Sequence, residues 1–337
     1  MIVVATSIEG IQTCDNGTIL YGENIELYVY GMMEFQSWFH HLDLLSNSPL
    51  HRKLLYAATD SFESLAYFGL RKSNYFARMK KFTSSVHKIW KIFGWGLFFP
   101  KEKIIQASVQ TELTVGFALA AMEFFEVERL KFESNQLNDQ TMQLSFQPSK
   151  KPMKSVSKVD SFDWDIDIEP SIEYDSSFEV DKRPTGWYLD EQRSFFLPRD
   201  TMLHFYHAML PLEFHTKHRK NELLEIEGIH DRHIQIFRSV LIASSLAEQE
   251  STEPSFVQTE DDWTNILGQI IPNRGFGQYQ ILQFDIHSRC VSLLIRSTNA
   301  PYIIGKIWSK WEKATGSSSK CSIVIEKSGV LFMFSPV

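Results

Sequence analysis

The chain has little of several residue types that would assign it to a class at once. Only three of its 337 residues are cysteines, Cys14, Cys290 and Cys321. They are too few and too scattered for a disulfide framework or a four-thiolate metal site, which fits a reducing compartment. Basic residues are not in surplus either, because 34 Lys and Arg against 41 Asp and Glu leave a net charge of -7. Such a charge repels a phosphate backbone, so nucleic acid is disfavoured as a partner.

Long apolar runs are also missing. The most apolar window, Leu113 to Met122, spans half of the roughly 20 residues that a bilayer crossing requires. Met1 to Thr6 has no basic region and no long apolar core, so it predicts a strand rather than a signal peptide. We expect a cytoplasmic protein without a transmembrane segment.

Signatures of catalysis and of nucleotide binding are absent from the sequence. It contains no Walker motif, no G-x-G-x-x-G, no H-E-x-x-H and no C-x-x-C. No Ser, Cys or Lys lies within a recognised nucleophile signature. We therefore expect a protein that is not an enzyme and that has no cofactor.

Aromatic residues are abundant, with 26 Phe and 8 Trp, and they supply material for large cores or for a pocket. The length favours two domains. Between them, Ser149 to Arg183 has four lysines over 150–158 and then nine acids over 160–181, a composition typical of an exposed connector. Aromatic residues such as Phe162 and Trp164 alternate with those acids, a spacing that also suits an extended segment docking on a basic surface. Both interpretations stay open.

The two flanks of this segment repeat one another. At a constant offset of 181 in residue number, Tyr56 falls on Phe237, Leu65 on Leu246, and Gly94-Trp95-Gly96 on Gly275-Phe276-Gly277. Further along the offset is 189, and a helical stripe in the first flank matches one in the second, with Gly116 on Gly305. We expect the glycines beside Trp95 and Phe276 to let the backbone turn closely into a sheet.

Each repeat predicts the same order of elements: a hairpin, helices, a Gly-aromatic-Gly strand, a helix and a closing hairpin. The closing hairpins are expected over 130–133 with 142–146 and over 322–326 with 330–334. This order indicates an α+β fold made of two tandem copies of an antiparallel sheet backed by helices. The expected domains are 1–148 and 184–337, with an acidic linker over 149–183.

This order, with Gly-Trp-Gly opening the central strand and a closing hairpin of the form Val/Ile-Glu then Phe-x-Phe, resembles the 4-vinyl reductase domain. The superfamily of that domain also includes haem nitric oxide binding domains and subunits of the transport protein particle, a tethering complex. The resemblance covers most of each flank. Many members carry cysteines in the closing hairpin, whereas Ser134 follows Glu133 here and Lys327 follows Glu326. This departure puts the metal and redox roles of the family in doubt for this chain.

The resemblance implies a pocket for small hydrophobic molecules in the sensor branch and subunit pairing in the scaffold branch. Fold alone does not decide between them. Our leading expectation is a non-enzymatic protein that binds a small hydrophobic ligand, or a protein partner, and acts through its domain interface. The alternative is an assembly or tethering scaffold similar to the transport protein particle subunits. The third is a metal-dependent enzyme built on histidine pairs.

Those histidines lie between positions 204 and 233, in three pairs spaced i, i+3: His204 with His207, His215 with His218, and His230 with His233. On a helix, residues three apart share a face, and neutral imidazole is a ligand for zinc, iron or copper. His204 and His207 are the candidate metal ligands, with zinc or iron as the cofactor. The alternative is that these are ordinary surface or core histidines, because no second motif completes a site.

A basic stretch without acids predicts a partner-binding face. Basic and aromatic residues interleave between positions 71 and 91, and the candidate partner-binding residues are Arg71, Lys72, Arg78, Lys80, Lys81 and Lys88. The matching stretch of the second repeat, 252–272, has acids and no Lys or Arg. We hypothesise that the opposite faces, or the basic face and the acidic linker, meet within one chain or in a homo-oligomer. A solvated charged face is the alternative.

Aromatic residues of the first repeat provide the candidate ligand pocket. The first repeat is preferred because alanines 118, 120 and 121 in its last helix are slimmer than the tryptophans of the second repeat. The alternative is that these side chains fill core volume. The candidate pocket residues are Phe35, Trp38, Phe39, Tyr56, Phe62, Trp90 and Trp95.

Overall fold

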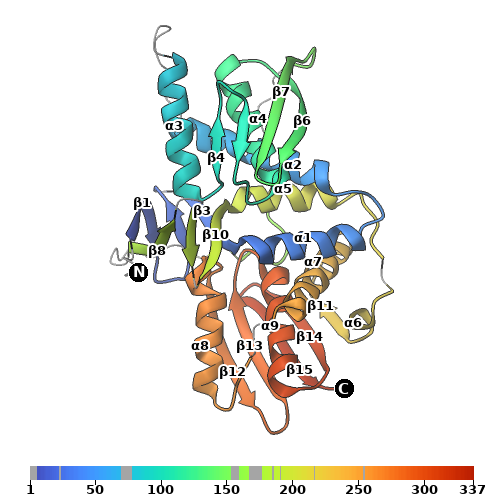
Figure 1. Ribbon diagram of the computed structural model, residues 1–337. Helices are drawn as coiled ribbons and strands as arrows, with labels where there is room; N and C mark the ends of the chain where they lie inside the picture. Colours follow the sequence, from blue (N-terminus) through green and yellow to red (C-terminus); the bar gives the residue numbers. More distant parts are fainter. Residues whose placement is uncertain are drawn as a thin grey trace.

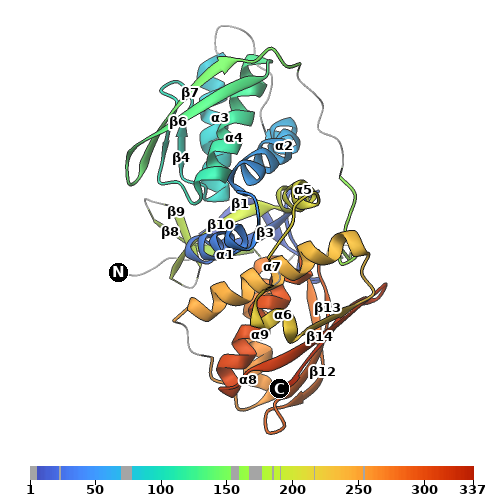
Figure 2. The same cartoon turned by 90° about the vertical axis from the view of Figure 1, so that its right-hand side faces the viewer.

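The computed structural model describes residues 6–22, 24–69, 78–152, 159–166, 177–183, 186–189, 191–215, 217–252 and 255–337. The fold is α+β, as the sequence predicts, with antiparallel sheets backed by helices (Figure 1). Two lobes lie on opposite sides of a small barrel, and two helices, one from each half of the chain, lie beside the barrel between the lobes (Figure 2).

The barrel takes three strands from each half of the chain. The first half gives β1 (Thr6–Thr13), β2 (Ile19–Tyr21) and β3 (Ile25–Gly31), and the second gives β8 (Ser177–Arg183), β9 (Gly186–Leu189) and β10 (Gln192–Pro198). The strand order is β1-β2-β3-β10-β9-β8, closed by an antiparallel pairing of β1 with β8. β3 pairs with β10, where Tyr30 lies opposite Phe195. The two halves are thus joined by backbone hydrogen bonds, and their buried side chains form one continuous core.

The first lobe holds three helices over a four-stranded sheet. The sheet order is β4-β5-β7-β6. Its elements are α2 (His51–Gly69), α3 (Arg78–Phe93), β4 (Leu97–Phe99), β5 (Ile104–Gln106), α4 (Thr111–Glu126), β6 (Leu130–Asn138) and β7 (Thr141–Pro148). β6 and β7 are the closing hairpin that the sequence predicts.

The second lobe repeats this plan and adds one strand at the edge of its sheet, in the order β11-β14-β15-β13-β12. The added strand is β11 (Leu224–Glu227), which follows the short helix α6 (Arg219–Glu222). The other elements are α7 (Asp231–Glu250), α8 (Glu260–Ile270), η2 (Pro272–Arg274), β12 (Gln278–Asp285), β13 (Cys290–Arg296), α9 (Ala300–Thr315), β14 (Ser319–Glu326) and β15 (Gly329–Pro336).

Each half of the chain packs one helix against the lobe of the other half. Helix α1 (Met32–Leu45) of the first half packs on α7 of the second, and α5 (Arg199–Met209) of the second packs on α2 of the first. The Trp95 indole donates a hydrogen bond to the Phe196 carbonyl at 2.7 Å, and Phe276 stacks on Tyr28 with 4.9 Å between ring centroids. Each Gly-aromatic-Gly motif therefore packs against the barrel strands of the other half.

Glycine is required in both motifs. Gly94 and Gly275 have φ of 74° and 79°, a left-handed conformation that side chains rarely adopt. A Cβ on Gly275 would lie 2.3 Å from the Leu27 carbonyl oxygen, and one on Gly94 would lie 2.9 Å from that of Ser194. The structural role predicted for these glycines is confirmed. Leu27 and Ser194 therefore hold equivalent positions in the two halves, so β3 and β10 correspond at an offset of 167 in residue number.

The same test corrects the register predicted for the first long helix pair. A Cβ on Gly116 would lie 2.3 Å from the Leu55 carbonyl oxygen, and one on Gly305 would lie 2.1 Å from that of Leu241. Helices α2 and α7 therefore correspond at an offset of 186, and the predicted 181 is wrong there. Tyr56 is 52% exposed, whereas Phe237 is fully buried. The error arose because an apolar helical stripe repeats every three or four residues and so does not fix a register.

The acidic segment is not a plain linker where the structure describes it. Phe162 and Trp164 are buried, stacked on each other with 4.5 Å between centroids, and Phe162 packs on His207. Asp163 accepts a hydrogen bond from the backbone of His230 at 2.7 Å and pairs with the His233 ring at 2.9 Å. The segment docks on aromatic and histidine side chains of α5 and α7, because burying two aromatic rings offsets the cost of ordering the backbone. Its end, 177–183, is strand β8.

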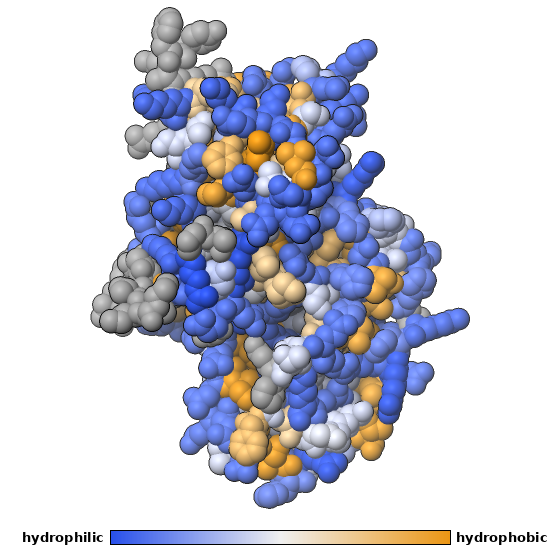
Figure 3. Space-filling model, in the orientation of Figure 1, coloured by the Kyte–Doolittle hydropathy of each residue, from blue (hydrophilic) through white to orange (hydrophobic). Residues whose placement is uncertain are grey.

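The surface seen in Figure 3 is mainly hydrophilic, with hydrophobic residues in separate patches. Scattered apolar residues are usual on a protein surface. Within the described part of the chain, no helix is both long and apolar enough to cross a bilayer.

Candidate functional site

A cavity of about 460 Å³ lies at the junction of the two halves. Helix α1 of the first half forms one wall, and α7, α9, β10 and η2 of the second half form the others. Charged and polar side chains line much of it, among them Glu34, Glu248, Arg274, Tyr302 and Lys306. Trp38 and Met33 contribute apolar surface.

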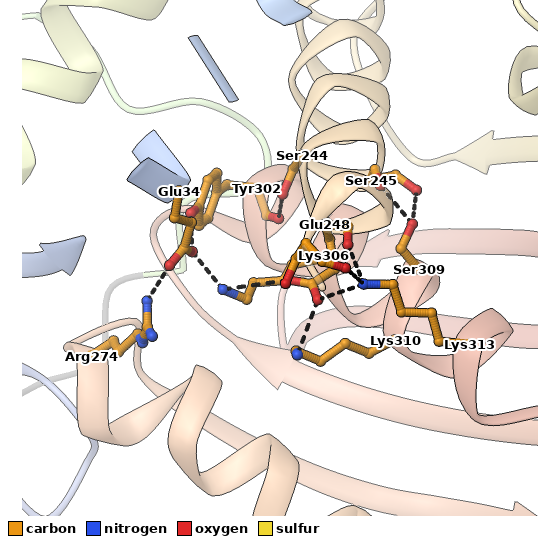
Figure 4. A network of polar contacts seen from close by, with 11 residues as sticks. Glu34, Ser244, Ser245, Glu248, Arg274, Tyr302, Lys306, Ser309, Lys310 and Lys313 are labelled. Atoms are coloured by element: carbon orange, nitrogen blue, oxygen red, sulfur yellow. Dashed lines mark hydrogen bonds and ion pairs between the residues drawn. The ribbon is translucent and has the colours of Figure 1, made fainter. Parts of the chain in front are cut away.

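Glu34 is the centre of the polar wall. It lies in the first turn of α1, where a carboxylate is favoured by the helix dipole. One carboxylate oxygen lies 2.5 Å from the Arg274 guanidinium, and the other lies 2.6 Å from Nζ of Lys306 and accepts a hydrogen bond from the Tyr302 hydroxyl (Figure 4). A first-half carboxylate thus binds three side chains of the second half.

Charge pairing outweighs burial at Glu34. Burial alone would raise the pKa of its carboxyl group, but Arg274, Lys306 and the hydrogen bonds from Lys306 and Tyr302 hold the pKa well below the ordinary value. The pKa of Tyr302 is raised by burial and by the adjacent Glu34 carboxylate. Glu34 is therefore ionised and Tyr302 neutral at physiological pH.

A second carboxylate, Glu248 on α7, continues the network (Figure 4). It is buried and faces three lysines of α9. Its oxygens lie 3.0 Å from Nζ of Lys310, 3.5 Å from that of Lys313 and 3.6 Å from that of Lys306. Lys306 therefore links the two carboxylates.

The corresponding positions of the first lobe are not charged. At the offsets established above, Glu34 corresponds to Thr201 and Tyr302 to Leu113. The four charged residues Glu248, Arg274, Lys306 and Lys313 correspond to Phe62, Phe93, Phe117 and Phe124. The ring contact between Phe62 and Phe117, with 6.0 Å between centroids, takes the place of the ion pair between Glu248 and Lys306. One fold thus packs the same junction in an apolar and in a charged form.

The apolar form shows that the charges are not needed for the fold. Replacing a buried ion pair by well-packed apolar residues is often neutral or stabilising by about 1–4 kcal/mol. A charged junction beside an open cavity is consequently a candidate for function.

Further polar contacts hold the halves in one register near the cavity. Asn299 donates to the Tyr30 hydroxyl at 2.8 Å and accepts from the Tyr206 hydroxyl at 2.8 Å, and all three side chains are buried. Burial raises the pKa of Tyr30 and of Tyr206 well above the ordinary value, so both hydroxyls stay neutral.

The predicted pocket residues do not gather around one cavity. Phe35, Trp38, Phe39, Phe62, Trp90 and Trp95 are buried core residues that pack on other aromatic rings. Trp38 also lines the junction cavity. Tyr56, 52% exposed, lines a different cavity between α2, α4 and β6.

The candidate metal ligands have other contacts. Nε2 of His207 lies 2.7 Å from the Asp160 carbonyl oxygen, and burial lowers the pKa of His204. His218 and His230 accept hydrogen bonds from the backbone at the N-termini of α6 and α7. Over the described ranges, no group of three or more His, Cys, Asp and Glu side chains is arranged to hold a metal ion.

The predicted partner-binding face is described only in part. Arg71 and Lys72 lie outside the described residues, and Arg78 begins α3. Lys80, Lys81 and Lys88 are exposed on α3, and Lys88 pairs with Glu9 of β1 at 2.9 Å. Helices α3 and α8 lie on opposite sides of the barrel, so the described parts of the basic face and of the acidic face of the second repeat do not meet within one chain (Figures 1 and 2).

Sequence reasoning missed the charged junction. One feature of the sequence bears on it: Lys306, Lys310 and Lys313 share the helix face opposite Trp308 and Trp311, and Lys306 and Lys310 on that face are buried as well. Lysines on a buried stripe require a partner, but the sequence does not show that Glu34 and Glu248 provide it.

Comparisons with protein-family models, with curated proteins and with solved structures give no match to this chain. No relative therefore indicates what the cavity binds.

Proposed function

We propose that this protein is a non-catalytic small-molecule-binding protein whose ligand occupies the junction cavity. The observation that carries the proposal is the charged junction itself, which stands where the first lobe has phenylalanines. A volume of about 460 Å³ lies within the usual range of ligand sites.

The wall chemistry favours a small polar molecule over the hydrophobic ligand that the family resemblance implies. Glu34, Lys306 and Arg274 offer charge, and Tyr302 and Ser244 border the same space. An apolar ligand would leave these groups without compensation for the water that it displaces, which costs binding energy. A polar ligand with hydrogen-bonding groups replaces that water.

The cavity position suits a regulatory role through the domain interface. Its walls come from both halves, and Glu34 of α1 binds residues of η2 and α9 directly. A ligand that changes these contacts changes how α1 packs on α7. Occupancy is then coupled to the relative arrangement of the halves, provided that the ligand binds one arrangement better than another.

Native mass spectrometry of freshly purified protein tests the proposal with a matched pair of variants. Ala247 lines the cavity, so Ala247→Phe fills it, whereas Gln249, two positions further along α7, is exposed and does not line it. We expect a small bound mass on the wild type and on Gln249→Phe, and a bare chain for Ala247→Phe. A bare wild-type chain, or an adduct retained by Ala247→Phe, contradicts the proposal.

A further inference from the structure

The two lobes differ at one edge of their sheets. In the second lobe, β11 lies parallel to β14, and the backbone N–H of Cys321 donates to the Leu223 carbonyl at 2.8 Å. In the first lobe, β6 corresponds to β14 and ends the sheet, so no described strand covers its outer edge. Such an edge presents unpaired backbone groups to any extended chain.

Two matching carboxylates show which residues of the edge strand β6 correspond to which residues of β14. Glu123 at the end of α4 accepts a hydrogen bond from the backbone of Leu130 at 2.9 Å, and Glu312 accepts one from Ser319 at 2.9 Å. Glu123 and Glu312 correspond at the offset of 189, and so do Leu130 and Ser319. At this offset Phe132 corresponds to Cys321, so the Phe132 amide holds the position that is bonded to the covering strand in the second lobe.

The first lobe has a cavity where the second has the covering segment. This edge cavity, of about 450 Å³, is lined by Leu119, Leu130 and Phe132 among others. The residues that correspond to Leu119 and Phe132, Trp308 and Cys321, are covered. Nζ of Lys220 lies 3.9 Å from the Trp308 ring centroid, and the buried Leu224 pairs with Cys321. The edge cavity therefore lies where α6 and β11 lie in the other lobe.

The charged side chains around the edge cavity indicate which kind of segment it would bind. Arg52, Lys131 and Lys151 border the edge cavity and are exposed. Among the described residues that line it, the one carboxylate is Glu123, which already pairs with Arg129 at 2.7 Å. Complementary potential therefore favours an acidic guest.

The alternation of side chains along β6 determines which way these charges face. Leu130 and Phe132 alternate with Lys131, which faces outward with Glu133. A guest strand in the register of β11 sets its apolar residues beside Phe132 and an outward residue beside Lys131. Glu133 would repel an acidic residue placed beside it. The acidic residues of the guest strand are therefore expected at the end that lies beside Lys131.

We propose that the free edge of β6 accepts an extended acidic segment of another polypeptide as an added parallel strand. Two apolar residues of this segment enter the edge cavity, in the way that Leu224 is buried beside Cys321 in the second lobe. The acidic end of the segment lies beside Lys131. Backbone hydrogen bonds supply affinity and the cavity supplies specificity, as in other cases of strand addition.

The test uses the whole protein and a fluorescein-labelled peptide, Gly-Asp-Glu-Leu-Ser-Ile-Ser-Gly, with fluorescence anisotropy as the readout. Ser134 corresponds to Ile323, which pairs with Ile226 of β11, so Ser134→Pro removes an edge amide while Ser134→Ala keeps it. We expect Ser134→Pro to weaken peptide binding by at least about tenfold and Ser134→Ala by less than about twofold.

A charge pair provides a second test that does not alter the backbone. Lys131→Glu weakens binding by about tenfold or more, whereas Lys320→Glu, at the corresponding position beside the occupied edge, leaves it within about twofold. Replacing Asp-Glu by Lys-Lys in the peptide abolishes binding to the wild type.

Three results overturn the proposal. The first is a wild-type protein that does not bind the acidic peptide, and the second is a Ser134→Pro protein that melts like the wild type and binds equally well. The third is a doubled mass in light scattering that Ser134→Pro returns to one chain, because the guest would then be a second copy pairing edge to edge.

Discussion

Glu34→Gln is the most direct test of the charged junction. The Glu34 carboxylate lies 2.5 Å from Arg274 and 2.6 Å from Lys306, with side-chain exposures of 15% for Glu34 and 8% for Lys306. Gln keeps the shape and removes the charge, so two cations lose this carboxylate in a place with little water. Breaking a buried ion pair costs about 3–5 kcal/mol. Lys306 keeps Glu248 at 3.6 Å, so we expect the lower end of that range, about 3 kcal/mol.

Urea unfolding at pH 7, followed by tryptophan fluorescence, measures the loss as a change in the free energy of unfolding. Glu250→Gln is the control, because Glu250 borders the same cavity but is 61% exposed and pairs with His41 at 3.0 Å. An exposed pair of this kind contributes less than about 1 kcal/mol. A Glu34→Gln protein as stable as the Glu250→Gln protein would refute the view that Glu34 is the electrostatic centre of the junction.

The pH dependence of the free energy of unfolding tests the same interaction independently. The pKa of Glu34 is lower in the folded protein than in the unfolded chain, so its stabilising contribution is complete above the unfolded pKa of about 4.3 and is lost as pH falls toward the folded pKa. The stability difference between wild type and Glu34→Gln should shrink by about 1.4 kcal/mol for each pH unit below that point. A difference that stays constant between pH 7 and pH 3.5 contradicts the lowered pKa.

Two further predictions concern the junction and the acidic segment. The triple variant Glu34→Thr, Arg274→Phe and Lys306→Phe copies the first lobe at these three positions and leaves Glu248 with Lys310 and Lys313. Its free energy of unfolding should be at least about 2 kcal/mol above that of Glu34→Gln in the same urea assay, with loss of any bound mass; equal stability of the two proteins contradicts this. Trp164→Ala should lower the free energy of unfolding by about 3–5 kcal/mol, because the buried ring leaves a cavity, whereas a plain linker would lose less than about 0.5 kcal/mol.

The fold was predictable because local pattern and glycine chemistry agree with it. The period of the apolar residues gave the helices, and the Gly-aromatic-Gly motifs gave corresponding points in the two halves. Those points were reliable because Gly94 and Gly275 meet backbone oxygens that tolerate no Cβ. The register of α2 and α7 was not predictable from an apolar stripe, which overlays at several shifts. The exchange of contacts across the barrel, such as α1 on α7, depends on pairings between segments far apart in the sequence, which no local pattern records.

The candidate site was hidden because its charges come from four separate segments. Glu34, Glu248, Arg274 and Lys306 are each ordinary in their sequence context, and composition only shows that the chain has acids and bases in plenty. The aromatic residues chosen for a pocket were the more visible signal, yet abundance of large apolar side chains is also what a core requires. Of the seven aromatic residues that the sequence predicts for a pocket, six are therefore core residues.

Internal duplication supplies the comparison that relatives would otherwise provide. Where the halves agree, as in the glycine motifs and the carboxylates that anchor β6 and β14, the fold accounts for the residue. Where they differ, the fold does not require it: the junction has charge in place of phenylalanine, and among the described residues β6 has no counterpart of the strand that covers β14. Both departures lie beside cavities of similar size, one that we propose for a small polar molecule and one for an extended chain. Because the first half contributes to both, α1 to one and β6 to the other, a ligand at the junction and a peptide at the edge would both contact the first half of the chain, and the variants above separate the two sites.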